Sequence, residues 1–347
     1  MNTLIKKVRN TAELSNDPVI KEAGRILKNG GLVAFPTETV YGLGANALSL
    51  EASGKIYAAK GRPSDNPLIA HIADIDMLES LVYDISEKAR LLMEAFWPGP
   101  MTLIFKKKDI VPYATTGGLN TVAIRMPSNN IARALIRQAG VPIAAPSANK
   151  SGRPSPTMAE HVKEDLYGVI DMIIDDGPTD FGLESTIIDV SEEEPVILRP
   201  GAITDSMVQN VLGKISSSFE FSEEEGEGPK APGMKYKHYA PKAKMILLRG
   251  NQEKIISTIN QLSAGEKNFA LMITKELQEQ YQGPGRIYIM GKASEPETIG
   301  ANIFKLLRQI DADGCELVFT EGIEEKGIGI AVMNRLKKAC GYNIVDV

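Results

Sequence analysis

Short apolar runs that lead into loops rich in proline, glycine and hydroxyl side chains recur in this 347-residue chain. Residues 32–35 lead into such a loop at 36–44, and residues 142–145 lead into another at 146–149. Segments with helical periodicity separate the runs, as between Asp17-Pro18 and Gly30-Gly31. The alternation predicts an α/β fold with polar loops at its strand ends, where open α/β sheets bind ligands.

The same patterns divide the chain into two expected domains, 1–213 and 243–347, joined by a linker at 214–242. In the first domain we expect strands at 32–35, 68–73, 101–105, 121–126, 142–145, 169–175, 185–190 and 196–199, and helices at 17–30, 49–59, 74–82, 86–96, 130–139 and 204–212. In the second domain, strands and helices alternate at short intervals, which predicts a small doubly wound α/β domain.

The expected linker has two halves of different composition. Five glutamates and no Lys or Arg lie between Glu220 and Glu227, a composition typical of a disordered segment. Residues 231–241 carry two tyrosines, a histidine and two lysines between prolines, which is too specific for a plain spacer.

Composition excludes several classes of protein. The formal net charge is −5, and because the linker holds five of the acids, the remainder is close to neutral and does not indicate a general nucleic-acid-binding surface. The two cysteines, Cys315 and Cys340, are far apart and do not form a disulfide scaffold or a zinc motif. The first residues lack the apolar region of a signal peptide, and no apolar run could span a membrane, so we expect a cytoplasmic protein.

A candidate phosphate site is spread over several loops. Lys60 and Arg62 are two cations held between Gly61 and Pro63. Taken alone, such a pair is equally consistent with a solvated surface. Ser147 and Asn149 would add neutral groups and Arg199 a third cation, although Arg199 by itself is as consistent with a surface position.

Two better-known phosphate motifs are not supported by the sequence. There is no Walker A motif. Gly42-x-Gly44-x-x-Ala47 imitates a dinucleotide fingerprint, but the segment that follows it is too short and polar to be the helix that should open there.

Two polar residues, His71 and Arg125, lie inside apolar strands. A histidine in such a strand is more often a hydrogen-bonded core residue than a ligand contact. A buried guanidinium needs an anion, and we expect a ligand carboxylate to supply it to Arg125. With three histidines and no clustered acids, the sequence gives no sign of a transition metal held by the protein.

Several motifs together resemble the YrdC-like threonylcarbamoyl-AMP synthases. These are Pro36-Thr-Glu-Thr-Val-Tyr-Gly-Leu-Gly44, Lys60-x-Arg62-Pro-x-x-Asn66-Pro-Leu68, Trp97-Pro-Gly-Pro100, Arg125-Met-Pro127, Ala145-Pro-Ser-Ala-Asn149, Ser185-Thr186 and Arg199-Pro-Gly201. Residues 231–241 and the α/β tail are similar to the long, two-domain form of that family. The resemblance implies a twisted mixed sheet with helices around a large cavity, followed by the small α/β domain.

The resemblance also implies an activity: condensation of L-threonine, bicarbonate or CO2, and ATP into threonylcarbamoyl-AMP, with release of pyrophosphate. Mg²⁺ would arrive with ATP, and the product would pass to a separate transferase that modifies tRNA. By motif match, the catalytic residues would be Lys60, Arg62, Ser147 and Asn149. ATP would be held by Arg62, Asn66, Thr121, Ser147, Ser155, Arg199 and Tyr239, and threonine by Thr39, His71, Arg125, Ala145 and Ser185.

Two further expectations concern the linker and the alternative function. Because Tyr239 lies on the linker, we expect residues 231–241 to fold over the first domain as a lid. The alternative is an RNA-binding module of the same fold, which would need a basic face and exposed aromatic side chains. The near-neutral charge and the 6% aromatic content argue against it.

Overall fold

The computed structural model describes residues 2–9, 11, 14–218, 231–232, 238–266 and 268–347. The described residues form two compact units. The second unit contains 238–347 together with two short segments, 152–154 and 181–183, and the remaining described residues form the first unit. The acidic half of the expected linker, and residues 233–237 of the expected lid, lie outside the described residues.

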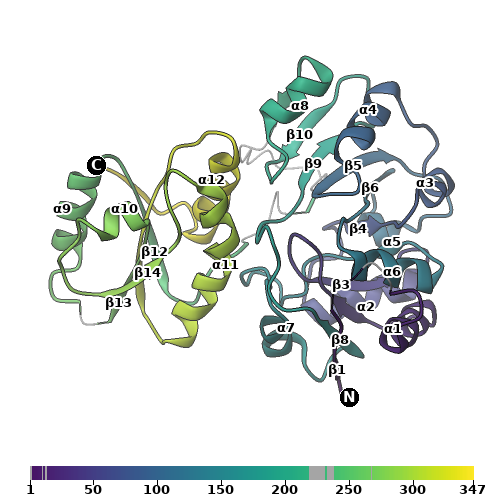
Figure 1. Ribbon diagram of the computed structural model, residues 1–347, viewed down its shortest axis with the longest axis horizontal. Helices are drawn as coiled ribbons and strands as arrows, with labels where there is room; N and C mark the ends of the chain where they lie inside the picture. Colours follow the sequence, from purple (N-terminus) through teal and green to yellow (C-terminus); the bar gives the residue numbers. More distant parts are fainter. Residues whose placement is uncertain (1, 10, 12–13, 219–230, 233–237, 267) are drawn as a thin grey trace. The chain divides into compact units, whose positions relative to one another are not determined.

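The first unit is built on an 11-stranded mixed sheet in the order β1-β8-β2-β3-β7-β4-β6-β5-β9-β10-β11 (Figure 1). Its strands are β1 (Leu4–Lys7), β2 (Val33–Phe35), β3 (Gly42–Asn46), β4 (Ile69–His71), β5 (Met101–Lys106), β6 (Thr121–Arg125), β7 (Ile143–Ala144), β8 (Met172–Asp175), β9 (Thr186–Asp189), β10 (Val196–Arg199) and β11 (Ser216–Ser217). Its helices are α1 (Pro18–Lys28), α2 (Leu50–Lys60), α3 (Ile75–Leu81), α4 (Glu87–Phe96), α5 (Tyr113–Thr116), α6 (Asn130–Ala139), α7 (Ala159–Leu166) and α8 (Asp205–Leu212).

Local signals explain where the helices begin and end. The Asp17 side chain accepts hydrogen bonds from the amides of Val19 and Ile20 and so caps α1. Helix α2 ends at Lys60 because Gly61 takes a left-handed conformation, with φ of 61°. Lys60 is therefore the last residue of a helix, and the Lys-Gly-Arg motif is a helix end.

Two apolar clusters hold the helices to the sheet. One joins α1 and α6 to β2 and β8 through side chains that include Ile20, Leu135 and Phe35. The other joins α2, α3 and α4 to the central strands and includes Ile56 and Leu92. Each such fully buried side chain contributes about 1.5–3 kcal/mol of transfer free energy, so these clusters stabilise the packing of the helices on the sheet.

The sequence prediction was wrong for part of the loop at 36–44, because Gly42–Asn46 is strand β3. Gly44 pairs with Val33 of β2, and a Cβ at Gly44 would lie 2.8 Å from the Phe35 ring and 2.9 Å from Ile143. Gly44 therefore serves close packing in the sheet. Strands β1 and β11 and helices α5 and α7 were not predicted.

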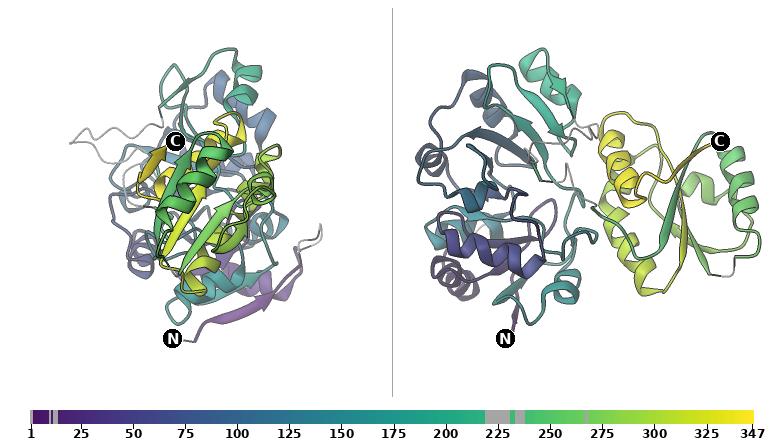
Figure 2. Two further views of the ribbon diagram at one scale, coloured as in Figure 1. Left: turned by 90° about the vertical axis from the view of Figure 1, so that its left-hand side faces the viewer. Right: turned by 180° about the vertical axis from the view of Figure 1, so that it is seen from behind.

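The second unit has a five-stranded sheet in which every pair is parallel, in the order β14-β13-β15-β12-β16. Its elements are β12 (Lys244–Arg249), α9 (Gln252–Leu262), β13 (Phe269–Ile273), α10 (Lys275–Gln278), β14 (Arg286–Ile289), α11 (Pro296–Ala312), β15 (Leu317–Glu321), α12 (Ile328–Ala339) and β16 (Ile344–Asp346). Helices α9 and α10 cover one face and α11 and α12 the other, as seen in Figure 1 and from behind in the right panel of Figure 2. This is the doubly wound arrangement expected.

Helix α11 holds the two short segments that join this unit from the first part of the chain. The Arg308 side chain donates to the Pro154 carbonyl at 2.6 Å. Gly182 lies so close to the helix that a Cβ there would come within 2.6 Å of the Ala301 Cα. Within the described residues, no helix is long and apolar enough to cross a membrane.

Candidate active site

One face of the large sheet carries a row of polar side chains. In strand register His71 on β4 lies opposite Arg125 on β6, which lies opposite Thr102 on β5. Paired residues point to the same face of a sheet. Two positions along the same strands, Ile69 and Ala123 form an apolar cluster with Ile104, Ile187, Leu198 and Ala231. The face therefore combines an apolar floor with a polar edge.

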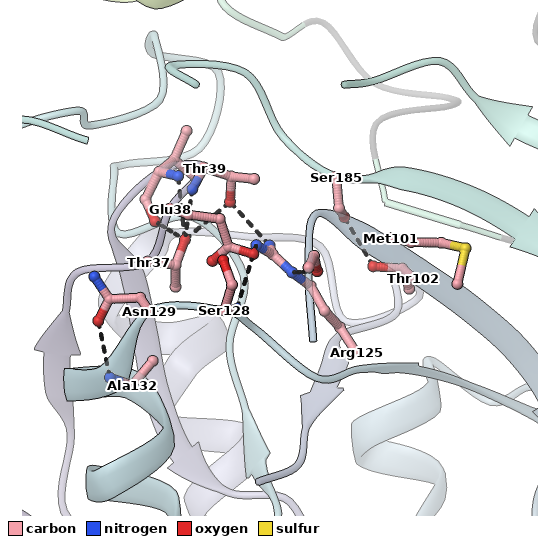
Figure 3. A network of polar contacts seen from close by, with 12 residues as sticks. Thr37, Glu38, Thr39, Met101, Thr102, Arg125, Ser128, Asn129, Ala132 and Ser185 are labelled. Atoms are coloured by element: carbon pink, nitrogen blue, oxygen red, sulfur yellow. Dashed lines mark hydrogen bonds and ion pairs between the residues drawn. The ribbon is translucent and has the colours of Figure 1, made fainter. Parts of the chain in front are cut away.

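Arg125 is held in a buried ion pair with Glu38. Its Nη2 lies 2.7 Å from Glu38 Oε1, and the two side chains are only 4% and 3% exposed. The Ser128 amide donates to the same Glu38 oxygen at 3.1 Å (Figure 3). Arg125 Nε donates to the Gly99 carbonyl at 3.3 Å. The anion that a buried guanidinium requires is thus supplied by Glu38, which corrects the expectation that a ligand must supply it.

The charge state of Glu38 follows from this pairing. Burial alone would raise the pKa of the Glu38 carboxyl, but the charge and hydrogen bond of Arg125, together with the Ser128 amide, hold it below its usual value. Glu38 is therefore an anion at neutral pH. Its Oε2 has no hydrogen-bond partner among the described residues.

Arg125 also contacts a predicted threonine-binding residue. Its Nη1 donates to the Thr39 hydroxyl at 2.9 Å. Thr39 is fully buried, on the loop between β2 and β3. The structure thus brings these two candidates into direct contact, and Glu38 fixes the guanidinium behind them.

His71 is buried and neutral. Burial, together with the positive charge of Arg125, lowers the pKa of His71 to about 3. Its Nδ1 lies 3.1 Å from the Ile69 carbonyl, so in the neutral ring this nitrogen carries the proton and donates. Such an imidazole can orient a substrate but is not a cation at physiological pH.

A second group of contacts joins Ser185 to Arg199. Arg199 donates to the Ser185 carbonyl through Nε at 3.1 Å and Nη2 at 2.9 Å, and Nη2 also lies 3.1 Å from the Ser185 hydroxyl. That hydroxyl is 2.8 Å from the Thr102 hydroxyl. Because Thr102 lies opposite Arg125 in register, these contacts run from the Arg125 row toward Arg199.

Gly201 explains why the Arg199-Pro-Gly motif ends in glycine. A Cβ at Gly201 would lie 2.4 Å from the Thr186 amide nitrogen and 2.8 Å from the Ser185 carbonyl carbon. Both are backbone atoms that cannot rotate away. Glycine is therefore needed for Arg199 to reach Ser185.

A third group surrounds Lys60. Its ammonium donates to the backbone carbonyls of Ser147 and Asn149, the latter at 2.5 Å, and lies 3.4 Å from Asn149 Oδ1. The Ser147 hydroxyl donates to the same amide oxygen at 2.5 Å. In this conformation Lys60 ties the end of α2 to the 147–149 loop, so three of the four candidate catalytic residues form one cluster.

Arg62, the fourth, folds back over its own loop. It donates to Asn66 Oδ1 at 2.5 Å and to the Pro67 carbonyl at 2.9 Å. This contact joins two residues predicted to hold ATP. Gly117 closes the other side of the loop, since a Cβ there would come within 2.7 Å of the Asp65 carbonyl oxygen.

The remaining candidates lie at defined places. The Ala145 amide donates to the Ile69 carbonyl at 2.8 Å, which attaches the 145–149 loop to β4 beside His71. Ser155 is buried and donates to Glu184 Oε1 at 2.6 Å, and Thr121 is half-buried at the start of β6.

The expected lid has described residues in both units. Arg199 Nη1 donates to the Pro232 carbonyl at 3.2 Å, and Ala231 is fully buried in the apolar floor. Tyr239 belongs to the second unit, where its ring centre lies 5.0 Å from that of Phe304. The lid therefore stays a prediction.

Sequence reasoning missed the residues behind the predicted ones. Glu38, Thr37, Thr102 and Glu184 each bond directly to a candidate site residue. A signal existed for Glu38: it is the one carboxylate in the 36–44 segment, and a buried arginine requires an anion. Thr102, inside an apolar strand, carried no comparable signal.

Comparison with known proteins identifies the family. Residues 25–201 match the family described as telomere recombination, and residues 203–341 match threonylcarbamoyl-AMP synthase, C-terminal domain. The chain is 47% identical over 345 residues to threonylcarbamoyl-AMP synthase from Pyrococcus abyssi, covering 99% of this chain and 100% of that protein. The chain belongs to the threonylcarbamoyl-AMP synthase family.

A further relative and a solved structure agree. The threonylcarbamoyl-AMP synthase of Bacillus subtilis is also 47% identical, over 96% of this chain and 97% of its own length. The crystal structure of Sua5 from Pyrococcus abyssi complexed with L-threonine superposes with a TM-score of 0.92, at 46% identity, covering 99% of this chain and all of that one. The resemblance inferred from the motifs, the expected fold class and the expectation of a nucleotidyl-transferring enzyme of this family are confirmed.

Proposed function

We propose that this chain is a cytoplasmic L-threonylcarbamoyladenylate synthase whose amino-acid subsite lies at the Arg125–Thr39 contact and whose nucleotide subsite lies around Lys60, Arg62 and Arg199. The observation that carries the proposal is the polar row along the sheet, with His71, Arg125 and Thr102 adjacent in register and Ser185 and Arg199 bonded to its end. The relative that was crystallised with L-threonine covers 99% of this chain at 46% identity.

The reaction needs the protein to position its reactants and to shield them from water. The amine of threonine condenses with bicarbonate or CO2 to a carbamate, and a carbamate oxygen then attacks the α-phosphorus of ATP while pyrophosphate leaves. A carbamate is a weak nucleophile that decomposes in water, so orientation and exclusion of solvent provide most of the catalysis. The candidate groups are suited to this, because Lys60, Asn149 and Arg199 are each no more than 5% exposed.

Each side chain would have a task consistent with its chemistry. The remaining Arg125 protons would contact the threonine carboxylate, with Thr39, His71, Ala145 and Ser185 around the rest of the amino acid. Lys60, Arg62 and Arg199 would stabilise the charge on the triphosphate, with Asn66, Thr121, Ser147, Ser155, Asn149 and, from the linker, Tyr239 as neutral contacts.

Magnesium would enter with the nucleotide. The groups around Lys60 are cations and neutral donors, which suit phosphate oxygens and not a bare metal ion. Among the described residues there is no cluster of three His, Cys, Asp or Glu side chains that would bind a metal. Mg²⁺ on the triphosphate would neutralise part of its charge.

The product would pass to a separate tRNA threonylcarbamoyl transferase, without strong direct binding of nucleic acid by this chain. The test is release of pyrophosphate from ATP, measured with threonine and bicarbonate omitted in turn. We expect release to require both. Pyrophosphate release that is independent of threonine would contradict the proposal.

A further inference from the structure

A buried hydrogen bond joins Ser155, one of the residues predicted to hold ATP, to Glu184. The Ser155 hydroxyl lies 2.6 Å from Glu184 Oε1, a distance typical of a hydroxyl that donates to an ionised carboxylate. Ser155 is 1% exposed and Glu184 is 7% exposed, so bulk water does not compete for this bond. Within the described parts of the chain, no group donates a hydrogen bond to the Ser155 oxygen.

The direction of this hydrogen bond fixes what Ser155 can offer a ligand. A carboxylate only accepts, so the single proton of the Ser155 hydroxyl is used by Glu184. The lone pairs of the hydroxyl oxygen remain for a ligand. In this state Ser155 accepts a hydrogen bond from a ligand and donates none.

Neighbouring contacts place the Ser155–Glu184 pair beside the proposed amino-acid subsite. The Tyr41 amide donates to the Pro156 carbonyl at 2.9 Å, which ties the segment that carries the serine to the loop between β2 and β3. Glu184 directly precedes Ser185, a residue proposed to contact threonine. The pair is therefore attached to two segments that carry candidate threonine contacts.

The state of Ser155 decides which part of ATP suits it. The phosphate oxygens of ATP are negative acceptors, so they would meet an oxygen with no proton to give and an anionic carboxylate behind it. The nucleoside carries donors, namely the two ribose hydroxyls and the adenine amino group. The ribose bears the α-phosphate that must lie against the threonine carbamate, so it is the donor-bearing part nearest the amino-acid subsite.

We infer that Ser155 binds a ribose hydroxyl of ATP, and that Glu184 is the positioning residue that holds Ser155 as an acceptor. The inference rests on the proposed function, because it takes Ser155 to contact ATP. It also orients the nucleotide, with the ribose at Ser155 and the triphosphate extending toward Lys60 and Arg62, whose charges complement it.

The first experiment measures the KM of ATP, 2′-deoxy-ATP and 3′-deoxy-ATP by pyrophosphate release. In the wild type we expect one of the two deoxy analogues to have a KM about tenfold higher than ATP, equivalent to about 1.4 kcal/mol. In Ser155→Ala this preference should fall to within about twofold, with the threonine KM changed less than twofold. A wild type that does not distinguish either analogue, or a Ser155→Ala protein that keeps the full preference, would overturn the inference.

The adenine amino group is the alternative donor, and purine riboside triphosphate, which lacks it, tests this case. If Ser155→Ala abolished a preference for ATP over this analogue but kept the ribose preference, the assignment to ribose would be wrong. Contact with the phosphates is tested by pyrophosphate, which has no nucleoside. Its inhibition constant should change less than twofold in Ser155→Ala, and a tenfold weakening would overturn the inference.

The role of Glu184 is tested with Glu184→Met, which cannot accept the serine proton, and Glu184→Gln, which keeps an acceptor oxygen. We expect Glu184→Met to lose most of the ribose preference and Glu184→Gln to keep it within about twofold. Added to Ser155→Ala, Glu184→Met should cause no further change in the ATP KM beyond about twofold. A further tenfold rise there, or equal effects of Met and Gln, would contradict a role through Ser155.

Two controls keep these outcomes interpretable. If Glu184→Met does not fold, Glu184→Leu is judged by the same criteria. A wild-type protein that releases no pyrophosphate in response to threonine would refute the proposed function. Threonine-dependent release without any ribose preference would refute only the inference about Ser155, so the two failures are distinguishable.

Discussion

Removing Glu38 should destabilise the first unit strongly, because Glu38 is the carboxylate that compensates Arg125. In Glu38→Ala the guanidinium stays 4% exposed at its present position but loses a counter-ion 2.7 Å away. Breaking a buried pair by removing one partner costs about 3–5 kcal/mol, since an uncompensated charge remains. We expect a loss of that size in the free energy of unfolding.

A double variant distinguishes the cost of the uncompensated Arg125 charge from the cost of lost packing. Replacing both partners, in Glu38→Gln/Arg125→Met, removes both charges while keeping similar volumes. Such replacements are often neutral or stabilising. We therefore expect the double variant to recover most of the stability lost in Glu38→Ala, while threonine-dependent turnover falls because Arg125 is absent.

The assay is urea unfolding followed by tryptophan fluorescence. The chain has one tryptophan, Trp97, whose indole donates to the Met101 carbonyl at 2.7 Å, so the signal reports on the first unit. A loss below about 1 kcal/mol in Glu38→Ala, or a double variant no more stable than Glu38→Ala, would refute the assignment of Glu38 as the counter-ion.

The ion pair also gives a pH dependence of known sign. Because the native pKa of Glu38 is lowered, its stabilising contribution is present above the ordinary carboxyl pKa and is lost as the pH falls through the native value. Glu38→Gln has no proton to bind there. The difference in unfolding free energy between wild type and Glu38→Gln should therefore shrink in acid, and a constant difference would contradict the pairing.

Three further predictions concern neighbouring residues. The pKa of His71 is about 3 in the native protein and about 6.5 in the unfolded chain. As the pH falls from 6 to 4, the free energy of unfolding, measured by urea titration, should therefore decrease faster in the wild type than in His71→Asn, by about 1.4 kcal/mol per pH unit. Equal slopes in the two proteins would contradict a neutral native His71. Gly201→Ala should displace Ser185, costing about 1–3 kcal/mol in urea unfolding and raising the KM for both threonine and ATP; unchanged kinetics would show that the backbone can yield. Lys60→Ala should abolish pyrophosphate release but change threonine binding, measured by calorimetry, only a little. Arg125→Ala should weaken threonine binding at least tenfold. If the two variants lost pyrophosphate release and threonine binding to the same extent, separate subsites would be contradicted.

The strands and helices around the site could be predicted because their signals are local. Asp17-Pro18 and Gly140 mark helix ends by their own chemistry, and each stands at the expected boundary. Helix α2 runs one residue past its expected end at 59, because Gly61 terminates it after Lys60. Strand β3 could not be predicted in the same way, because glycines such as Gly42 and Gly44 are typical of loops. Their place in a strand follows only from the pairing of β3 with β2.

The candidate site shows the same limit. The motifs predicted site residues on loops and at strand ends. In the structure, hydrogen bonds connect Thr39 with Arg125, Ser185 with Arg199 and Lys60 with Asn149. What sequence could not give was the pairing between distant segments. Glu38 and Arg125 are 87 positions apart, and only the folded sheet makes one the counter-ion of the other.

The most direct test of the account is a product analysis with ¹³C-labelled bicarbonate, threonine and ATP. If the carbamate of threonine attacks the α-phosphorus, mass spectrometry will find one species that contains AMP, threonine and a single labelled carbon, formed in step with pyrophosphate. Pyrophosphate that accompanies unlabelled threonyl-AMP, or free AMP with no labelled adduct at any time, would contradict the account.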